Sequence, residues 1–335
     1  MPIPGSLMAA EIAEQPAVLA RVLRDGASAA ALARAALDRY RPRFVVLAAR
    51  GTSDHAALYG KYLAEVQLGL PAGLASPSSI TVYGSRPDMR GVLFVAVSQS
   101  GESPDLVESM QIARRFGALT VAVTNNAGSP LAHAAEHHVD VLAGAERAVA
   151  ATKTYTAQLL VLHLLLGTGD PSGVPDAAAR TLDSAAGAAY EAAQRFRYAD
   201  RLVTTGRGFS YPTAREAALK LMETSYLAAQ AFSGADLLHG PLAMLGPDVP
   251  VVAVATPGRG AAAMEPVLER LAAAAVEVLR VGPADGLPVA SAGVPESLLP
   301  ILEILPLQQL AWRLALDRGG DPDRPRGLSK VTETW

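Results

Sequence analysis

Residues 98–103, with the sequence SQSGES, combine hydroxyl side chains with a glycine between an apolar run and Pro104. An apolar run, a polar loop and a proline in this order are typical of a strand that leads into a helix. Hydroxyls and backbone N–H groups converge at such a junction, and the helix N-terminus adds positive potential that favours an anion. The segment therefore indicates a phosphate-binding loop without a Walker-type lysine, although an ordinary polar loop has the same composition.

A second polar loop, residues 50–53 (RGTS), follows the preceding apolar run. The carboxyl ends of neighbouring parallel strands lie at one edge of a sheet, where α/β proteins bind their ligands. If the two strands are neighbours, both loops face one crevice, and we expect a phosphate to bind there.

Three charged residues, Glu216, Lys220 and Glu223, are spaced by four and three positions. This spacing places them on one face of a helix. A carboxylate beside a lysine could act as a general acid/base. A solvated helix carrying an ion pair would show the same spacing, so the pattern alone leaves both interpretations open.

Histidine and lysine provide two further candidates. His239 precedes a Gly-Pro pair that could hold its imidazole at a loop tip, although a lone histidine is usually structural or exposed. Lys330 lies in the basic segment 324–330 (RPRGLSK), which a solvated tail would also explain. His137 and His138 are adjacent, but no further ligand is spaced to complete a metal site. We interpret that pair as surface and expect neither a metal nor an organic cofactor.

The elements that position these residues occur twice along the chain. Residues 50–53 (RGTS) match residues 207–210 (RGFS), and residues 94–97 match residues 251–254, each at an offset of 157. Gly101 and Gly258, which follow the second of these matches by four residues, are also 157 positions apart. Two separate matches at one offset indicate a duplicated unit.

In both copies, short apolar runs alternate with segments whose apolar residues have helical spacing. Alternation of this kind predicts a parallel sheet with helices on both faces. The fold class is therefore α/β, with two tandem, doubly wound parallel sheets. The predicted strands are 44–48, 93–97 and 119–123, then 201–205, 251–254 and 276–281, and the predicted helices are 56–67 and 104–116, then one from 212 and 264–274.

The predicted domain boundaries follow from this rhythm. Residues 1–29 form a helical extension, 30–166 the first domain with the phosphate loop, and 191–335 the second domain with a C-terminal catalytic tail. Residues 167–190 are predicted as the linker, because the stretch from 167 to 175 is rich in glycine, proline and polar residues.

Composition excludes several classes of protein. The 335 residues are 50% apolar, carry a formal net charge of −3 and contain no cysteine. There is no basic block to suggest nucleic acid, and no disulfide or thiolate chemistry is possible. The longest apolar run, residues 159–166, contains His163 and is too short to span a bilayer. We expect a cytoplasmic protein with neither nucleic acid nor membrane as partner.

Six ordered stretches resemble the SIS (sugar isomerase) family, and most closely the isomerase half of glucosamine-6-phosphate synthase and its stand-alone relatives. They extend the motifs described above and run in the order that the family shows. The stretches are RGTSDHAALYGKYLAE, SQSGESPDLVESMQIAR, AVAATKTYTAQL, GRGFSYPTAREAALKLMETSY, LLHGPLAML and DPDRPRGLSKVTETW.

The resemblance implies a role for each candidate residue. Glu223 matches the carboxylate that moves a proton between C1 and C2 of the sugar, and Glu216 and Lys220 match its supporting residues. No cofactor is implied. The matches to the sugar-phosphate contacts are Thr52, Ser53, Ser98, Gln99, Ser100 and Ser103.

Two residues in the second half complete the implied site. His239 matches the ring-opening histidine, which the family's dimer contributes to the neighbouring subunit's site. Lys330 matches the lysine that closes over the open-chain sugar and can form an imine with its carbonyl. The resemblance therefore implies a homodimer with shared active sites and a small-molecule phosphosugar as substrate.

Departures from the synthase favour a different overall reaction. These residues include no counterpart of its glutaminase half and no cysteine, Ala151 replaces a serine, and Leu238 replaces a lysine. The ending KVTET is more similar to the short deaminase-type members. We therefore expect glutamine-independent conversion of glucosamine 6-phosphate into fructose 6-phosphate and ammonia.

Three alternatives stay open from the sequence. The enzyme could be a deaminase or isomerase of another phosphosugar such as galactosamine 6-phosphate, or a deglycase acting on a sugar–amino-acid phosphate. It could also be a non-catalytic sugar-phosphate sensor. The joint presence of Glu223, His239 and Lys330 argues against a sensor, because a sensor needs only the phosphate loop.

Overall fold

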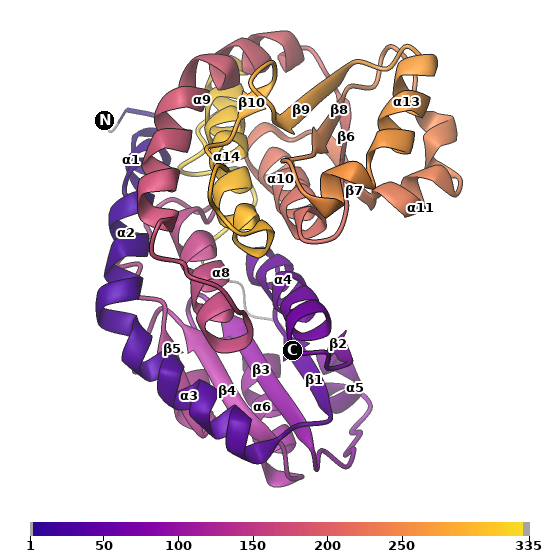
Figure 1. The fold of residues 1–335 in the computed structure, drawn as a ribbon. Coiled ribbons are helices and arrows are strands. Elements are labelled where there is room, and N and C mark those ends of the chain that lie inside the picture. The colour runs from indigo at the N-terminus through magenta and orange to yellow at the C-terminus, as the bar shows by residue number, and fades with distance from the viewer. Residues whose placement is uncertain (1–2, 331–335) are drawn as a thin grey trace. The chain divides into compact units, whose positions relative to one another are not determined.

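A computed structural model describes residues 3–330, and residues 331–335, which hold most of the KVTET ending, lie outside the described residues. The described chain divides into two compact units. The first-sheet unit comprises residues 17–145 and 153–170. The second-sheet unit comprises residues 3–16, 146–152 and 171–330. Each unit contains one parallel sheet (Figure 1).

The first sheet has the order β2-β1-β3-β4-β5, with every neighbouring pair parallel. Its central strands are nearly continuous apolar runs, as expected for strands that are covered on both faces. The strands are added in one direction from β1 to β2 and in the opposite direction from β3 to β5, so β1 and β3 form the topological switch point. The strands are β1 (Phe44–Ala48), β2 (Ala72–Leu74), β3 (Val92–Ser98), β4 (Leu119–Thr124) and β5 (His137–Asp140).

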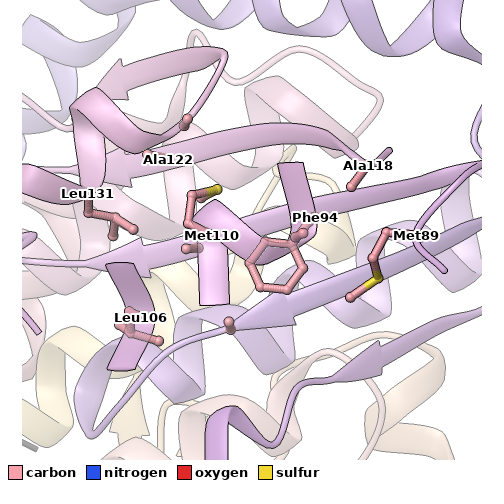
Figure 2. Packing of buried hydrophobic residues seen from close by; sticks show 11 residues of the cluster. Met89, Phe94, Leu106, Met110, Ala118, Ala122 and Leu131 are labelled. Carbon is pink, nitrogen blue, oxygen red and sulfur yellow. The ribbon is translucent and has the colours of Figure 1, made fainter. Parts of the chain in front are cut away.

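Helices cover both faces of the first sheet. One group packs together as α3 (Ala27–Tyr40), α4 (Thr52–Gln67) and α8 (Lys153–Leu166). The other group consists of α5 (Pro77–Thr81), α6 (Pro104–Arg115) and α7 (Pro130–Ala134). Figure 2 shows how Phe94 of β3 packs with Leu106 and Met110 of α6 in the buried core under this second group.

The second sheet has the order β10-β9-β8-β6-β7 and is also parallel throughout. Read from the other edge, this order repeats that of the first sheet strand for strand, with β6 and β8 at the switch point. The predicted fold of two tandem parallel α/β units is therefore confirmed. The strands are β6 (Arg201–Gly206), β7 (Ala228–Ser233), β8 (Val251–Val254), β9 (Val278–Gly282) and β10 (Leu287–Pro288).

Helices flank the second sheet in the same way. The long helix α14 (Leu299–Asp317) packs against both α9 (Val174–Phe196) and α10 (Ser210–Ser225). Shorter helices follow β7 and β8, namely α11 (Gly234–Leu238), α12 (Arg259–Ala262) and α13 (Glu265–Ala273). The remaining elements are α1 (Ser6–Ala13), α2 (Gln15–Arg21), η1 (Val22–Gly26), η2 (Pro241–Met244) and η3 (Glu296–Leu298).

The compact units differ from a simple serial division of the chain. Most of the segment predicted as a linker, residues 167–190, belongs to α9, because the turn residues end at Gly173 and an alanine-rich helix begins at Val174. The first turns of the predicted N-terminal extension pack within the second-sheet unit, where the Asp323 carboxylate accepts hydrogen bonds from the Leu7 and Met8 N–H groups. Among residues 3–330, no helix combines the length and apolar character needed to cross a bilayer.

Candidate active site

The hydroxyl-rich loop lies at the carboxyl end of β3, next to the switch point of the first sheet. Ser98 Oγ accepts a hydrogen bond from the Gly101 N–H at 3.1 Å, and Ser100 Oγ accepts one from the Glu102 N–H at 3.3 Å. Ser103 occupies the N-cap position of α6, but its side chain accepts no capping hydrogen bond. The loop therefore gathers hydroxyls at a helix N-terminus, where an anion is stabilised.

Gly101 allows this loop to turn tightly. Its φ of +70° lies in the left-handed region, and a Cβ placed on it would lie 2.2 Å from Ser129 Oγ. Any other residue would be strained and would also collide with the loop that follows β4. The glycine in the motif thus serves backbone packing, while the serines supply the polar groups.

The loop after β1 faces the same edge of the sheet. Arg50 Nη2 lies 2.6 Å from Asp105 Oδ2 in the first turn of α6, so an ion pair joins the two predicted loops. Thr52 is the first residue of α4. Ser53 is buried, and its Oγ accepts a hydrogen bond from Gln158 Nε2 of α8 at 3.0 Å.

These contacts bring together the sequence-predicted phosphate residues of the first-sheet unit, although Ser53 is turned toward α8. The backbone carbonyl of Gln99 accepts a hydrogen bond from the Asn125 N–H. Phosphate contacts by any of these residues stay a prediction.

The charged residues of α10 form a buried cluster in the second-sheet unit. The side chains of Glu216 and Lys220 are 0% and 1% exposed, and that of Glu223 is 21% exposed. Lys220 Nζ lies 3.5 Å from Glu216 Oε1 and donates a short hydrogen bond to Glu223 Oε2. Burial distinguishes this cluster from a solvated ion pair, because desolvated charges must be paired.

Electrostatics keep the lysine of this cluster charged. Burial alone would lower the pKa of Lys220, but the carboxylates of Glu223, Glu216 and Glu146 raise it above its usual value. A lysine that stays protonated can orient Glu223 and neutralise Glu216. Glu223 is therefore the one of these three side chains that reaches solvent while being held in place, which is the position an acid/base group needs.

Lys330 belongs to the same unit and contacts the carboxylate of Glu146, a residue that no sequence motif indicated. Its Nζ lies 3.0 Å from Glu146 Oε2 and donates to the Ala148 carbonyl at 2.7 Å. Glu146 is buried and also accepts a hydrogen bond from the Thr152 N–H at 2.8 Å. Lys330 and Glu146 are separated by 184 positions, so only the folded chain reveals the pair.

His239 lies on a separate element from the α10 cluster. It is the C-cap of α11, its backbone N–H donates to the Asp236 carbonyl, and its side chain is exposed. Gly240 follows with a φ of +128° and Pro241 begins η2. The structure therefore places the imidazole at a loop tip, as the Gly-Pro pair predicted.

Residues 3–330 contain no group of three or more histidine, cysteine or acidic side chains that could hold a metal ion. The His137–His138 pair is part of β5 and partly buried, so the expectation that this pair lies at the surface was wrong. His138 Nε2 lies 2.8 Å from Thr124 Oγ1, and burial lowers the pKa of His138.

The fold and the site together define a class of protein with two tandem parallel α/β units. A hydroxyl-rich loop lies at the switch point of the first sheet. In the second unit, the helix that follows β6, the counterpart of β1, carries an acidic cluster with a buried lysine. A model of the SIS domain family matches residues 40–167 and 195–279. These segments make up more than half of the chain, which therefore belongs to the SIS family.

Individual proteins extend this comparison. The chain is 35% identical over 302 residues to the glutamine–fructose-6-phosphate aminotransferase (isomerizing) of Methanothermobacter thermautotrophicus, an alignment that covers 85% of this chain and 51% of that protein. The chain thus spans about half the length of the curated relatives it matches. A crystal structure of a protein provisionally named phosphosugar isomerase, from Silicibacter pomeroyi, is 33% identical, with a TM-score of 0.84, and covers 96% of this chain and 100% of that chain.

A third comparison concerns the fold alone. Glucosamine-6-phosphate deaminase from Thermotoga maritima is 20% identical, has a TM-score of 0.79, and covers 98% of this chain and 100% of that chain.

Proposed function

We propose that this chain converts glucosamine 6-phosphate and water into fructose 6-phosphate and ammonia, without using glutamine. The observation that carries the proposal is the partly exposed Glu223 carboxylate held by a buried, charged Lys220. The provisional name of the Silicibacter protein and the name of the Thermotoga deaminase agree with a phosphosugar substrate.

The proposal gives the phosphate loop and the α10 cluster different tasks. The hydroxyls of Ser98, Ser100 and Ser103 and the N-terminus of α6 bind the phosphate. Hydroxyl and backbone donors suit a dianion, which needs several acceptor oxygens satisfied at once. The α10 cluster supplies the groups that act on the carbon atoms.

The chemistry requires a ring opening followed by one proton transfer. His239 assists opening of the ring to give the C1 aldehyde. Glu223 removes the C2 proton to give an enolamine and returns a proton to C1, which leaves an imine at C2. Water adds to that imine and ammonia leaves, so the products are the C2 ketone and ammonia.

Lys330 and Glu146 fit a supporting role in this scheme. An amine that closes over the open-chain sugar must be held in place before substrate binds, and the contacts of Lys330 with Glu146 and the Ala148 carbonyl do this. None of the 335 residues is a cysteine, so these residues include no thiol nucleophile for releasing ammonia from glutamine.

Two assays of the purified chain test the proposal. Ammonia release from glucosamine 6-phosphate is measured by a coupled assay, and exchange of the C1 proton of fructose 6-phosphate is followed in deuterated water. We expect both, with no stimulation by glutamine. Exchange without ammonia release from any amino-sugar phosphate would exclude a deaminase and leave an isomerase, and the absence of both would reject the proposed function.

An aldose–ketose isomerase acting on a phosphosugar without an amine is the second candidate. It is favoured by the same carboxylate, since proton transfer between C1 and C2 needs no nitrogen. A panel that pairs each amino-sugar phosphate with its hydroxyl counterpart separates the two candidates, because only a deaminase turns over the amino sugars faster.

A further inference from the structure

The switch point of the second sheet lies between β6 and β8, where the duplicated loops have lost most of their hydroxyls. The loop after β8, residues 255–258 (ATPG), stands where the first copy has serines. Ser210 stands at the position of Ser53 at the offset of 157. In an α/β unit a ligand ordinarily binds at the carboxyl ends of the strands that flank the switch point. The side chains that occupy this place in the second unit therefore indicate what replaces the ligand there.

A carboxylate of the chain itself occupies this edge. Ser210 Oγ donates to Glu303 Oε1 at 2.8 Å, and Thr213 Oγ1 donates to Glu303 Oε2 at 3.2 Å. Glu303 lies on α14 and is fully buried, as is Thr213, and Ser210 is buried as well. The two carboxylate oxygens thus each accept a hydroxyl in a place where water cannot replace either bond.

A second carboxylate covers the neighbouring loop. Glu296 Oε1 accepts the Gly260 N–H at 2.7 Å, and a Cβ placed on Gly258 would lie 2.7 Å from Glu296 Cδ. Glu296 therefore binds the loop after β8 and the start of α12, whereas Glu303 binds α10. The two residues lie within eight positions of each other but hold different elements.

The helix that Glu303 binds is the one that carries the acid/base cluster. Ser210 and Thr213 lie in the first turn of α10, and Glu216 follows Thr213 by less than one turn on the same helix. An α-helix is stiff over such a distance. A negative charge at its N-terminus also interacts favourably with the helix dipole.

The protonation state of Glu303 changes near neutral pH. Burial raises its pKa to about 7, although hydrogen bonds from Ser210 and Thr213 and the nearby Thr256 hydroxyl lower it. The Glu296 carboxylate on η3 raises the pKa further. Both hydroxyls bind most strongly to the ionised form, in which both oxygens accept.

We propose that Glu303 is a positioning residue whose ionised carboxylate anchors the first turn of α10 and thereby sets the placement of Glu223 for proton transfer. The inference rests on the proposed function, because it assigns Glu223 the proton transfer. It adds a group outside the cluster itself, on a helix that carries no other residue of the site.

Glu303→Gln tests this proposal, because the amide keeps the shape of the side chain but cannot ionise. We expect kcat at pH 8 to fall roughly 10- to 100-fold, with KM for glucosamine 6-phosphate changing less than about threefold, since a displaced acid/base group affects the chemical step. At pH 6, where only about a tenth of Glu303 is ionised in the wild type, the difference in kcat should shrink to between about two- and tenfold. Equal kcat at pH 8 would overturn the proposal.

Glu296→Gln is the matched control, because it neutralises the neighbouring carboxylate that binds the loop after β8. We expect its kcat at pH 8 to stay within about twofold of the wild type. If both variants lose activity equally, the loss arises from removing negative charge in this region and not from the contact between Glu303 and α10. That outcome rejects the proposed anchoring of α10. Ser210→Ala and Thr213→Val remove the same hydrogen bonds from the α10 side and replace Glu303→Gln if that variant does not fold.

Amide hydrogen exchange gives a readout that does not depend on turnover. Peptides covering residues 210–225 should exchange faster in Glu303→Gln than in the wild type or Glu296→Gln at pH 8. If the wild type turns over no amino-sugar phosphate while this exchange changes, the proposed function fails and the anchoring of α10 stands. If the wild type is active and the exchange is unchanged, the anchoring fails and the proposed function stands.

Discussion

Glu223 differs from its two neighbours on α10 in a single respect that matters for chemistry. Glu216 and Lys220 are completely enclosed, whereas about a fifth of the Glu223 side chain is exposed. A carboxylate that transfers protons must reach the substrate, and a buried partner must keep it oriented. The cluster meets both requirements with residues from one helix.

Glu223→Gln should therefore lower the rate without weakening substrate binding. The amide retains the size of the side chain but cannot accept a proton, and loss of general acid/base catalysis costs roughly 10²- to 10⁴-fold. Exchange of the C1 proton of fructose 6-phosphate in deuterated water measures the effect directly. Glu269→Gln, at an exposed position of α13, is the control. Exchange at the wild-type rate in Glu223→Gln would exclude this carboxylate as the base.

Ser100 provides the corresponding prediction for the phosphate loop. Ser100→Ala removes a hydroxyl that lies at the start of the loop leading into α6, and a hydrogen bond to a charged group contributes about 1.5–3 kcal/mol. We expect calorimetric titration with fructose 6-phosphate to show weaker binding by about 10- to 100-fold. Ser85→Ala, an exposed serine of the same unit, should bind normally. Unchanged affinity in Ser98→Ala and Ser100→Ala would place the phosphate elsewhere.

Local sequence patterns were sufficient to predict the position of residues that lie together on one loop or one helix. The loop at Ser100 is recognisable because a strand, a polar loop with a glycine, and a proline at the first position of a helix follow one another. The α10 cluster is recognisable from helical spacing. Glu146 and Glu303 carry no such signal, because each meets its partner only through tertiary packing across about 90 to 180 positions of the chain.

At the scale of elements, the carboxyl of Glu303 on α14 is buried against α10, and ionising it there costs free energy. The pKa of Glu303 is raised from the ordinary value of 4.5 to about 7 by burial. Between these values the carboxyl is protonated in the folded protein and ionised in the unfolded chain, so unfolding releases a proton. Stability therefore falls as the pH rises through this window and levels off above about pH 7.

Glu303→Gln should remove this pH dependence. The free energy of unfolding of the variant, relative to the wild type, should increase by as much as about 3 kcal/mol between pH 4.5 and pH 8. Urea denaturation across this range measures the difference, with Glu269→Gln expected to run parallel to the wild type. A constant difference across the range would mean that Glu303 does not titrate in this window.

This stability result also separates positioning from simple structural support. A residue that only holds the fold together lowers both stability and activity when it is replaced. As the pH rises from 4.5 to 8, Glu303→Gln is expected to gain stability relative to the wild type, while its kcat at pH 8 falls below that of the wild type. Opposite changes of this kind are typical of groups kept for function at a cost in stability.

At the scale of the whole chain, duplication has produced two sheets of identical strand order with different contents at their switch points. The first sheet presents the Ser98–Ser103 hydroxyls, and the second is occupied by Glu303 and Glu296. The repeat in the sequence was sufficient to predict two like sheets. Strands β2, β5, β7 and β10 were not recognised, because they are only partly apolar or very short.

The last prediction concerns a second copy of the chain. The resemblance to the SIS family implies that His239 acts in the neighbouring subunit's site, and the exposed position of His239 at the end of α11 leaves it available to another molecule. His239→Ala and Glu223→Gln should each be inactive alone. In a mixed dimer, one site would combine a native Glu223 from one chain with a native His239 from the other. Random pairing makes half of the dimers mixed, so refolding equal amounts together should restore about a quarter of wild-type activity. A mixture that stays inactive although subunit exchange is demonstrated by mass spectrometry would show that each site uses its own histidine.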